Sequence, residues 1–183
     1  MTGDTELHDL FMGHAVRTER TLVGLYARVT SGDISKGVFR SLAATVVEGA
    51  NVGSWMLADV SLAAWMTAQT GRATPALGIA PGGEETDRIL AGLDTLMQGL
   101  DDAKTERDAL LARYGRSEPA RAFQRAYVAA MQERPEVAGY RRVLNAEACE
   151  LCRWRYRGGK VFSVGTPFAQ HPGCGCYPEP VSR

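Results

Sequence analysis

The chain has 183 residues, of which 45% are hydrophobic and 23% are charged, and its formal net charge is zero. This length and composition suit one globular domain, or a helical body with one small appendage. A neutral chain has no overall electrostatic reason to bind nucleic acid or a membrane surface. Its start lacks the basic-then-apolar order of a secretory signal, and no apolar run approaches the roughly 18 residues of a membrane span. We therefore expect a soluble protein made in a cytoplasm.

The first third of the chain has the apolar periodicity of two long helices. Apolar residues recur at three- and four-residue steps over Asp4–Val29 and again over Ile34–Thr70. The second segment is rich in small residues, and Gly49 and Gly53 are expected to kink or divide it. A linker rich in proline and glycine follows at 72–83.

Two more helices are predicted before the residue pattern changes from helical to strand-like. The segment Glu84–Tyr114 is strongly charged with one apolar face, which is typical of a surface helix. Ser117 is expected to cap a further helix over Ser117–Glu133, with a proline in its first turn. The pair Arg134-Pro135 should end that helix, because the residue before a proline disfavours the helical conformation.

The remaining residues favour short strands. We expect strands over Tyr140–Leu144 and Lys160–Ser163, and an edge strand over Tyr177–Val181, whose two prolines cannot donate to a ladder. The predicted fold is mainly α, with a body of about four helices and a small C-terminal β-hairpin zinc-knuckle module. It divides into a helical hairpin region (1–71), a linker (72–83), a helical region (84–135) and a cysteine-rich metal-binding β module (136–183).

All four cysteines lie near the C-terminus, in two clusters. Cys149 and Cys152 form a C-x-x-C motif, and His171, Cys174 and Cys176 form the second cluster eighteen residues later. A disulfide framework would more often spread its cysteines through the chain that it must staple. Two clusters of soft ligands at hairpin distance instead favour a structural zinc ion, with His171 ahead of Cys176 as the fourth ligand. A disulfide between the clusters, or free thiols, are the alternatives.

A structural role for the metal follows from the surroundings of this motif. A short tail with few large apolar residues buries too little surface to hold itself together, and a closed metal site supplies the missing free energy. A catalytic zinc would need an open coordination position and a general base. The carboxylates nearest in sequence, Glu147 and Glu150, are typical of an ordinary surface.

The C-terminal region is locally basic. From Tyr140 onward it has seven basic and three acidic residues, whereas the preceding part has 14 basic and 18 acidic ones. The residues that could bind nucleic acid or an acidic partner are Arg141, Arg142, Arg153, Arg155, Arg157 and Lys160, interleaved with Trp154, Tyr156 and Phe162. Arginine and planar rings in alternation can hold a phosphate backbone and stack on bases. The alternative is that the rings pack under the metal loop and water solvates the arginines.

The same region carries a family resemblance. The stretches GYRRVLNAEACELC and GGKVFSVGTPFAQHPGCGCYPEPV, between Gly139 and Val181, resemble the C-terminal signature of phage Mu F-like minor head proteins. They resemble in particular the versions found in phages of actinobacteria. That signature is a strand ending near C-x-x-C, a glycine turn with a short hydrophobic strand, and H-P-x-C-x-C. The resemblance covers about a quarter of the chain.

The resemblance implies a virion component of a tailed bacteriophage. Such a minor capsid protein acts in head morphogenesis, at the portal vertex or the capsid interior, after synthesis in the host cytoplasm. Its expected partners are the portal protein, the major capsid protein and, in some relatives, packaged DNA; no membrane contact is expected.

Some relatives are labelled capsid maturation proteases. That activity would require a nucleophile such as Ser163 or Thr166 paired with a free histidine. His171 belongs to the metal motif, while His8 and His14 lie on the first predicted helix, and no recognisable catalytic arrangement stands out. We therefore expect a protein that is not an enzyme. A zinc-knuckle nucleic-acid binder unrelated to virions is a further alternative.

Overall fold

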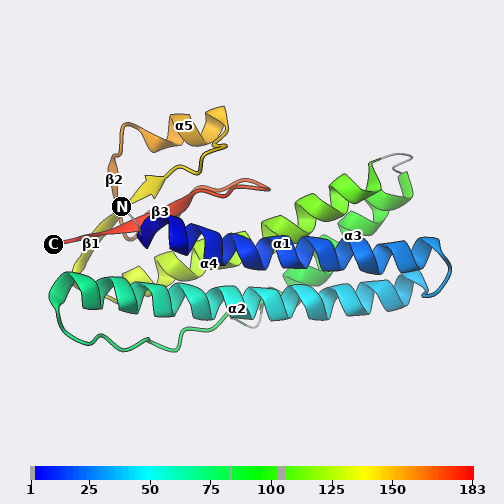
Figure 1. Cartoon of the computed structure of the whole chain (residues 1–183), viewed down its shortest axis with the longest axis horizontal. Coiled ribbons are helices and arrows are strands. Elements are labelled where there is room, and N and C mark those ends of the chain that lie inside the picture. Colours follow the sequence, from blue (N-terminus) through cyan, green and yellow to red (C-terminus); the bar gives the residue numbers. More distant parts are fainter. Residues whose placement is uncertain (1–2, 83, 103–105) are drawn as a thin grey trace.

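The computed structural model describes residues 3–82, 84–102 and 106–183 and is mainly α, with a small antiparallel sheet near the C-terminus (Figure 1). The predicted fold class is thereby confirmed. In chain order the elements are α1 (Gly3–Thr30), α2 (Lys36–Thr70), α3 (Glu84–Asp102), α4 (Arg107–Gln132), β1 (Val137–Val143), α5 (Glu150–Tyr156), β2 (Val161–Ser163) and β3 (Tyr177–Ser182). Among the described residues, none of the helices is long and apolar enough to cross a membrane.

Helices α1 and α2 form a long antiparallel hairpin (Figure 1). Ser35 caps α2, since its hydroxyl accepts a hydrogen bond from the Val38 amide at 3.2 Å. The expected division at Gly49 or Gly53 was wrong, because α2 is one helix from Lys36 to Thr70. Gly53 serves packing instead: a Cβ there would lie 3.0 Å from Cε1 of His14 on α1. The small residue lets the two helices approach.

The predicted boundary between the third and fourth helices was also wrong. The break falls between Asp102 and Arg107, and the part of the predicted helix at 103–105 lies outside the described residues. Ser117 is not a cap, since α4 continues through it and through Pro119. The segment packs tightly on α1, where a Cβ at Gly115 would lie 2.7 Å from the Glu19 Cα. This packing overrides a local capping signal and tolerates the hydrogen bond that a proline removes.

The interior consists of two apolar clusters along the helical body. The distal core lies between the four long helices and contains Leu22, Tyr26, Phe39, Ala43, Ala44, Val47, Ile89, Leu93, Leu96, Leu100 and Leu111. The proximal core joins the other end of the helices to the C-terminal module. Its members include Phe11, Leu62, Met66, Phe123, Tyr127, Met131, Val137, Tyr140, Cys152, Phe168, Cys174, Cys176 and Tyr177. The module therefore shares its interior with the helices.

The predicted linker lies against α2 in an extended conformation. Asp59, a buried residue of α2, accepts backbone hydrogen bonds from Leu77 at 2.9 Å, Gly78 at 2.6 Å and Ile79 at 3.3 Å. The Thr67 hydroxyl also accepts one from the amide of residue 74. These bonds satisfy a carboxylate that would otherwise be costly to bury. Of the predicted linker, residue 83 lies outside the described residues.

The sheet has the strand order β2-β1-β3, with both neighbours antiparallel to β1. Tyr140 lies opposite Phe162 of β2 and Pro180 of β3. The last strand is at an edge, as its prolines predicted. Gly139 is required beside β2, since a Cβ there would lie 2.2 Å from the Phe162 carbonyl oxygen.

Candidate metal centre

The first cysteine pair lies at the start of a short helix that sequence reasoning missed. Cys149 is the N-cap of α5, with an extended backbone at φ −70° and ψ 167°, and Cys152 follows in the first turn. The helix ends at Arg157, which is left-handed at φ 48°, before Gly158. A signal for it exists, since Glu150 stands in the first turn and arginines in the last, where each charge complements the helix dipole.

The second ligand cluster lies on the loop that leads into β3. The segment from His171 turns tightly, with the Cys174 amide donating to the His171 carbonyl at 3.0 Å and Gly173 at φ +77°. The Gly173 amide also donates to the Ser117 hydroxyl of α4 at 2.8 Å. This turn places both residues beside Cys152, whose Sγ lies 3.1 Å from the His171 Nε2 and 3.5 Å from the Cys174 Sγ, and it fastens the loop to the helical body.

Helix α4 holds the second half of the loop as well. The Gln124 side-chain amide donates to the carbonyl of Cys174 at 3.1 Å and to that of Cys176 at 2.5 Å. Gln124 is fully buried, so these carbonyls obtain a donor in a place that water does not reach. Phe11 of α1 stacks on Phe123 of α4, with ring centroids 4.6 Å apart, beneath this region. Helices α1 and α4 of the body therefore support and position the cysteine loop.

The five side chains predicted from the sequence come together in two groups that share Cys152, and either group could hold a metal ion. The His171 Nε2 lies 3.3 Å from the Cys149 Sγ and 3.1 Å from the Cys152 Sγ, and the sulfurs of Cys152 and Cys174 are 3.5 Å apart. In a tetrahedron with Zn–S of about 2.3 Å and Zn–N of about 2.05 Å, ligand pairs are separated by about 3.8 Å (S–S) and 3.6 Å (S–N). These three separations are shorter than the tetrahedral values by about 0.3 to 0.5 Å.

The ligand atoms form two triads that share Cys152. One contains Cys149, Cys152 and His171 and the other contains Cys152, Cys174 and Cys176, with the ligand atoms of each within 4.8 Å of one another. The four cysteines are free thiols. A disulfide would need an S–S separation of about 2.05 Å, which the 3.5 Å between Cys152 and Cys174 exceeds. Cys176 differs from the others in that its thiol also donates to the Asn145 side-chain oxygen at 3.7 Å.

One arginine lies beside the sulfurs. Arg142 is only 3% exposed, and its Nη1 lies 3.9 Å from the Cys152 Sγ and 4.0 Å from the Cys174 Sγ. Its Nη2 donates to the Ala169 carbonyl, and its guanidinium lies 4.0 Å from the centre of the Phe168 ring. A buried cation beside thiolates stabilises their negative charge. Arg142 is thus turned toward the cysteine cluster, whereas the sequence predicted it as part of a basic contact surface.

The thiols differ in how readily they ionise. The Cys152 backbone amide at the start of α5 lowers the pKa of Cys149, whereas burial raises the pKa of Cys152 to about 11. A hydrogen bond between the last two cysteines lowers the pKa of Cys174 to about 5 and raises the pKa of Cys176. Without a metal ion, repulsion between like charges opposes the ionisation of all the neighbouring sulfurs at once. A bound metal ion would allow the remaining ligands to ionise, with release of protons.

The other predicted basic residues take different positions. Arg141 is half exposed and forms an ion pair with Glu179 across the β1–β3 ladder. Arg153, Arg157 and Lys160 are exposed, and Arg155 is partly buried. Among the described residues, no carboxylate forms an ion pair with Arg153, Arg155, Arg157 or Lys160. They remain candidates for an external anionic partner.

The residues named for the protease alternative do not form a nucleophile–base pair within the described structure. The hydroxyls of Ser163 and Thr166 lie 3.0 Å from each other. The imidazole of His171 faces the two thiols through Nε2, and its Nδ1 lies 3.0 Å from the Pro172 carbonyl oxygen. His8 packs beside Phe11, with the rings edge to face. A serine protease needs a histidine within hydrogen-bond reach of its nucleophile.

Comparison with known proteins adds no relative to this picture. No protein-family model, no curated protein and no solved structure matches the chain.

Proposed function

We propose that this chain is a structural minor head protein of a tailed bacteriophage, of the Mu F-like type, whose C-terminal module is fastened by a zinc ion. The single observation that carries the proposal is the convergence of the motif residues. Cys149, Cys152, His171, Cys174 and Cys176, which carry the family resemblance, lie in two adjoining triads that share Cys152. The residues of this sequence signature therefore have a common physical role, which is to bind one metal ion.

The choice of zinc rests on the donor set. Thiolates with at most one imidazole, in a tetrahedral arrangement, are typical of structural zinc sites. The first ligand set we propose is Cys149, Cys152, His171 and Cys174, because the Cys176 thiol already donates to Asn145. Cys176 in place of His171 is the alternative. Either set fills all four positions with protein ligands, which leaves no open position for catalysis.

A long exposed stripe on α2 supports a protein partner such as the portal or the major capsid protein. Its large side chains are between 40% and 61% exposed and are Val38, Leu42, Val52, Met56 and Val60. With Thr45 and Gly49 they follow steps of four and three residues over roughly 33 Å of helix. A contiguous exposed apolar surface on a protein with a well-packed interior usually marks a contact with another protein.

Metal analysis tests the zinc half of the proposal. Elemental analysis of the purified chain should give about one zinc per chain, and the four thiols should react with a thiol reagent only after chelation. His171→Ala should reduce zinc retention strongly, whereas Cys176→Ser should retain it if the first ligand set is right. The reverse pattern would favour the all-cysteine set. A chain without metal and with freely reacting thiols would refute the zinc site.

Particle assembly tests the head-protein half. Particles assembled without this chain should be malformed or non-infectious when examined by negative-stain microscopy. Met56→Glu places a charge on the α2 stripe and should reduce incorporation of the chain into particles, as measured by mass spectrometry. The matched control is Gln98→Glu, which adds the same charge at an exposed position of α3. Normal infectious heads in the absence of the chain would refute the assignment.

A further inference from the structure

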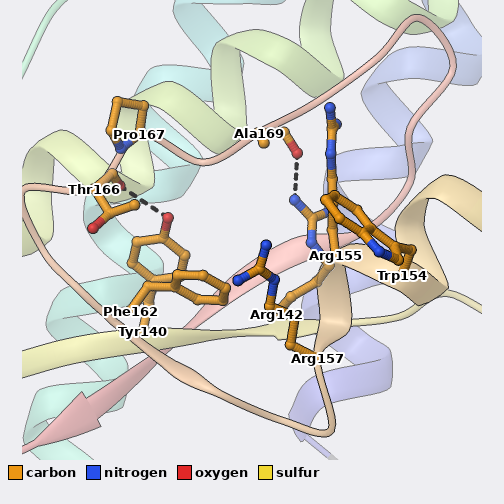
Figure 2. Close-up of a pocket in the computed structure, with 9 residues that line it drawn as sticks. All are labelled: Tyr140, Arg142, Trp154, Arg155, Arg157, Phe162, Thr166, Pro167 and Ala169. Atoms are coloured by element: carbon orange, nitrogen blue, oxygen red, sulfur yellow. Dashed lines mark hydrogen bonds between the residues drawn. The ribbon is translucent and has the colours of Figure 1, made fainter.

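A small cavity lies beside the cysteine cluster, on the side formed by β1, β2 and α5 (Figure 2). Its volume is about 230 Å³. It is lined by the rings of Tyr140, Trp154 and Phe162, by Arg142, Arg155 and Arg157, and by the loop that precedes His171. Pockets for drug-sized ligands measure roughly 300–1,000 Å³, so this one suits a single ring system rather than a large ligand.

The wall of this cavity has positive charge that the described part of the protein does not neutralise. Nη1 of Arg155 is buried and has no hydrogen-bond partner. Arg157 also lacks a carboxylate partner among the described residues, whereas Arg40 and Arg116 on the helical body each pair with an acidic side chain. A buried guanidinium nitrogen without an acceptor is costly, because it has lost its water. The position is therefore suited to an anionic oxygen from a ligand.

Planar groups stand at the same cavity. Trp154 is 66% exposed, and the Arg157 guanidinium lies 5.1 Å from its ring centroid. On the opposite side Tyr140 and Phe162 stack on each other, with centroids 5.6 Å apart and an interplanar angle of 24°. Figure 2 shows the indole and the guanidinium groups of Arg142 and Arg155 on one side of the cavity and the two stacked rings on the other. An exposed indole offers a free face to a planar ligand.

We propose that this cavity binds one nucleotide of a single-stranded nucleic acid. The base lies in the cavity with its face stacked on Trp154, and the adjoining phosphate accepts hydrogen bonds from Arg155 and Arg157. Stacking on an aromatic side chain together with a cationic groove is the usual mode of binding single strands. An acidic peptide would use the same guanidinium groups but would leave the indole face and the ring-sized cavity without a function. The nucleotide accounts for both.

The cavity depends on the cysteine cluster for its shape. Trp154 and Arg155 belong to the helix that Cys149 and Cys152 begin, and Ala169 lies two residues before His171. Arg142 lies between them, with one nitrogen near the sulfurs and the other bonded to the Ala169 carbonyl. This dependence rests on the proposed zinc site. Binding of the single strand should therefore be lost when the metal is removed.

The test is a titration of the full chain into a short fluorescein-labelled oligothymidylate, followed by fluorescence anisotropy at low salt. Trp154→Ala and Arg157→Gln should each weaken binding roughly 5- to 100-fold, as expected when one stacked base or phosphate contact is removed. Trp154→Phe, which keeps a ring, should restore most of the affinity. Arg72→Gln removes an exposed arginine outside the module and should leave binding unchanged.

Further readouts separate loss of the site from loss of the fold. Zinc content and far-UV circular dichroism of every variant should match the unsubstituted chain. Binding of the oligonucleotide should quench tryptophan fluorescence, and Trp154→Ala should abolish that quenching. The logarithm of the binding constant should fall with the logarithm of salt concentration at a slope of roughly −1 to −2, as expected for about two phosphate contacts with a single strand.

The outcomes distinguish this inference from the zinc proposal. A chain that contains zinc but does not bind the oligonucleotide, or binds it equally well after both substitutions, overturns the nucleotide site alone. If oligoglutamate displaces the oligonucleotide and the oligonucleotide does not quench tryptophan fluorescence, the arginines bind an acidic peptide. That result would also overturn the nucleotide site. Binding that depends on Trp154 and Arg157 in a chain without metal would retain the site and refute zinc.

Discussion

The distal core and the C-terminal module of this protein are filled by different chemistry. The distal core contains apolar side chains from four helices, among them Phe39 and Leu93. In the module, the centre is occupied by thiols, an imidazole and the buried guanidinium of Arg142. The first is stabilised by removal of apolar surface from water. The second contains polar groups that are costly to bury unless they are paired or bind an ion.

This difference indicates which interactions supply the folding free energy of each region. A four-helix body of this length can bury enough apolar surface to be stable without a ligand. The module has three short strands and one short helix, and part of its interior is borrowed from Phe11 and Phe123 of the body. We infer that removal of the metal affects the module first. The predictions below test this in order of decreasing effect.

The largest effect is expected from Cys152→Ser, because both ligand triads contain Cys152. Zinc content should fall to near zero. Amides of β1, α5 and the loop at 164–176 should lose protection in hydrogen–deuterium exchange, whereas those of the distal core should keep it. Leu151→Ser, at an exposed neighbouring position, is the control and should retain the metal. Equal loss of protection in both regions would show that the two are not energetically distinct.

A substitution that creates a cavity in the distal core should lower the stability of the helical body without loss of zinc. Phe39→Ala should lower the free energy of unfolding by about 3–5 kcal/mol, since Phe39 is fully buried. Zinc stoichiometry should not change. Val38→Ala, on the exposed face of the same turn, should change stability by less than about 0.5 kcal/mol. Denaturant unfolding with parallel metal analysis provides the measurement. Loss of zinc in the folded Phe39→Ala variant would contradict the separation of the two regions.

The contact between body and module should have an intermediate effect. Gln124→Met removes the donor to the carbonyls of Cys174 and Cys176 while keeping the side-chain length. Leaving buried carbonyls without a donor should cost about 1–3 kcal/mol and should increase the rate of metal loss to a chelator. Gln98→Met, at an exposed position, is the control. An unchanged release rate would mean that α4 does not position the cysteine loop.

The smallest effect concerns reactivity rather than stability. After chelation, iodoacetamide should modify Cys149 first and Cys176 last, as followed by mass spectrometry. Cys149 is exposed, and the helix amides lower its pKa. A larger fraction of Cys149 than of Cys176 is therefore the reactive thiolate at neutral pH. Cys176 is fully buried and its pKa is raised by the hydrogen bond to Cys174 and by burial. Equal rates at the two thiols would show that the module unfolds without metal.

Sequence patterns predicted those parts of the structure that depend on local periodicity. The two long helices follow from apolar residues at three- and four-residue steps, and the edge position of β3 follows from its prolines. The five candidate ligands were also predicted, because their side-chain chemistry and hairpin spacing are visible in the chain itself. The missed helix α5 is a case in which a usable charge pattern was present but was not used.

The errors have a common cause. Ser117 and Pro119 fit the start of a helix by local rules, but packing against α1 at Gly115 extends α4 through them. Ser117 then binds the Gly173 amide, a contact between residues 56 positions apart. Arg142 fitted a basic surface, yet it is turned inward beside the sulfurs. Nothing in a local window indicates either contact.

The sequence by itself thus determined the helical body, the sheet-forming tail and the set of candidate metal ligands, because these depend on short-range periodicity and on side-chain chemistry. Only the tertiary structure decided where α4 begins, which face the cysteine loop rests on, and that Arg142 lies between the sulfurs and the cavity. Those outcomes depend on contacts between distant residues. Their free energy exists only once the chain has brought the residues together.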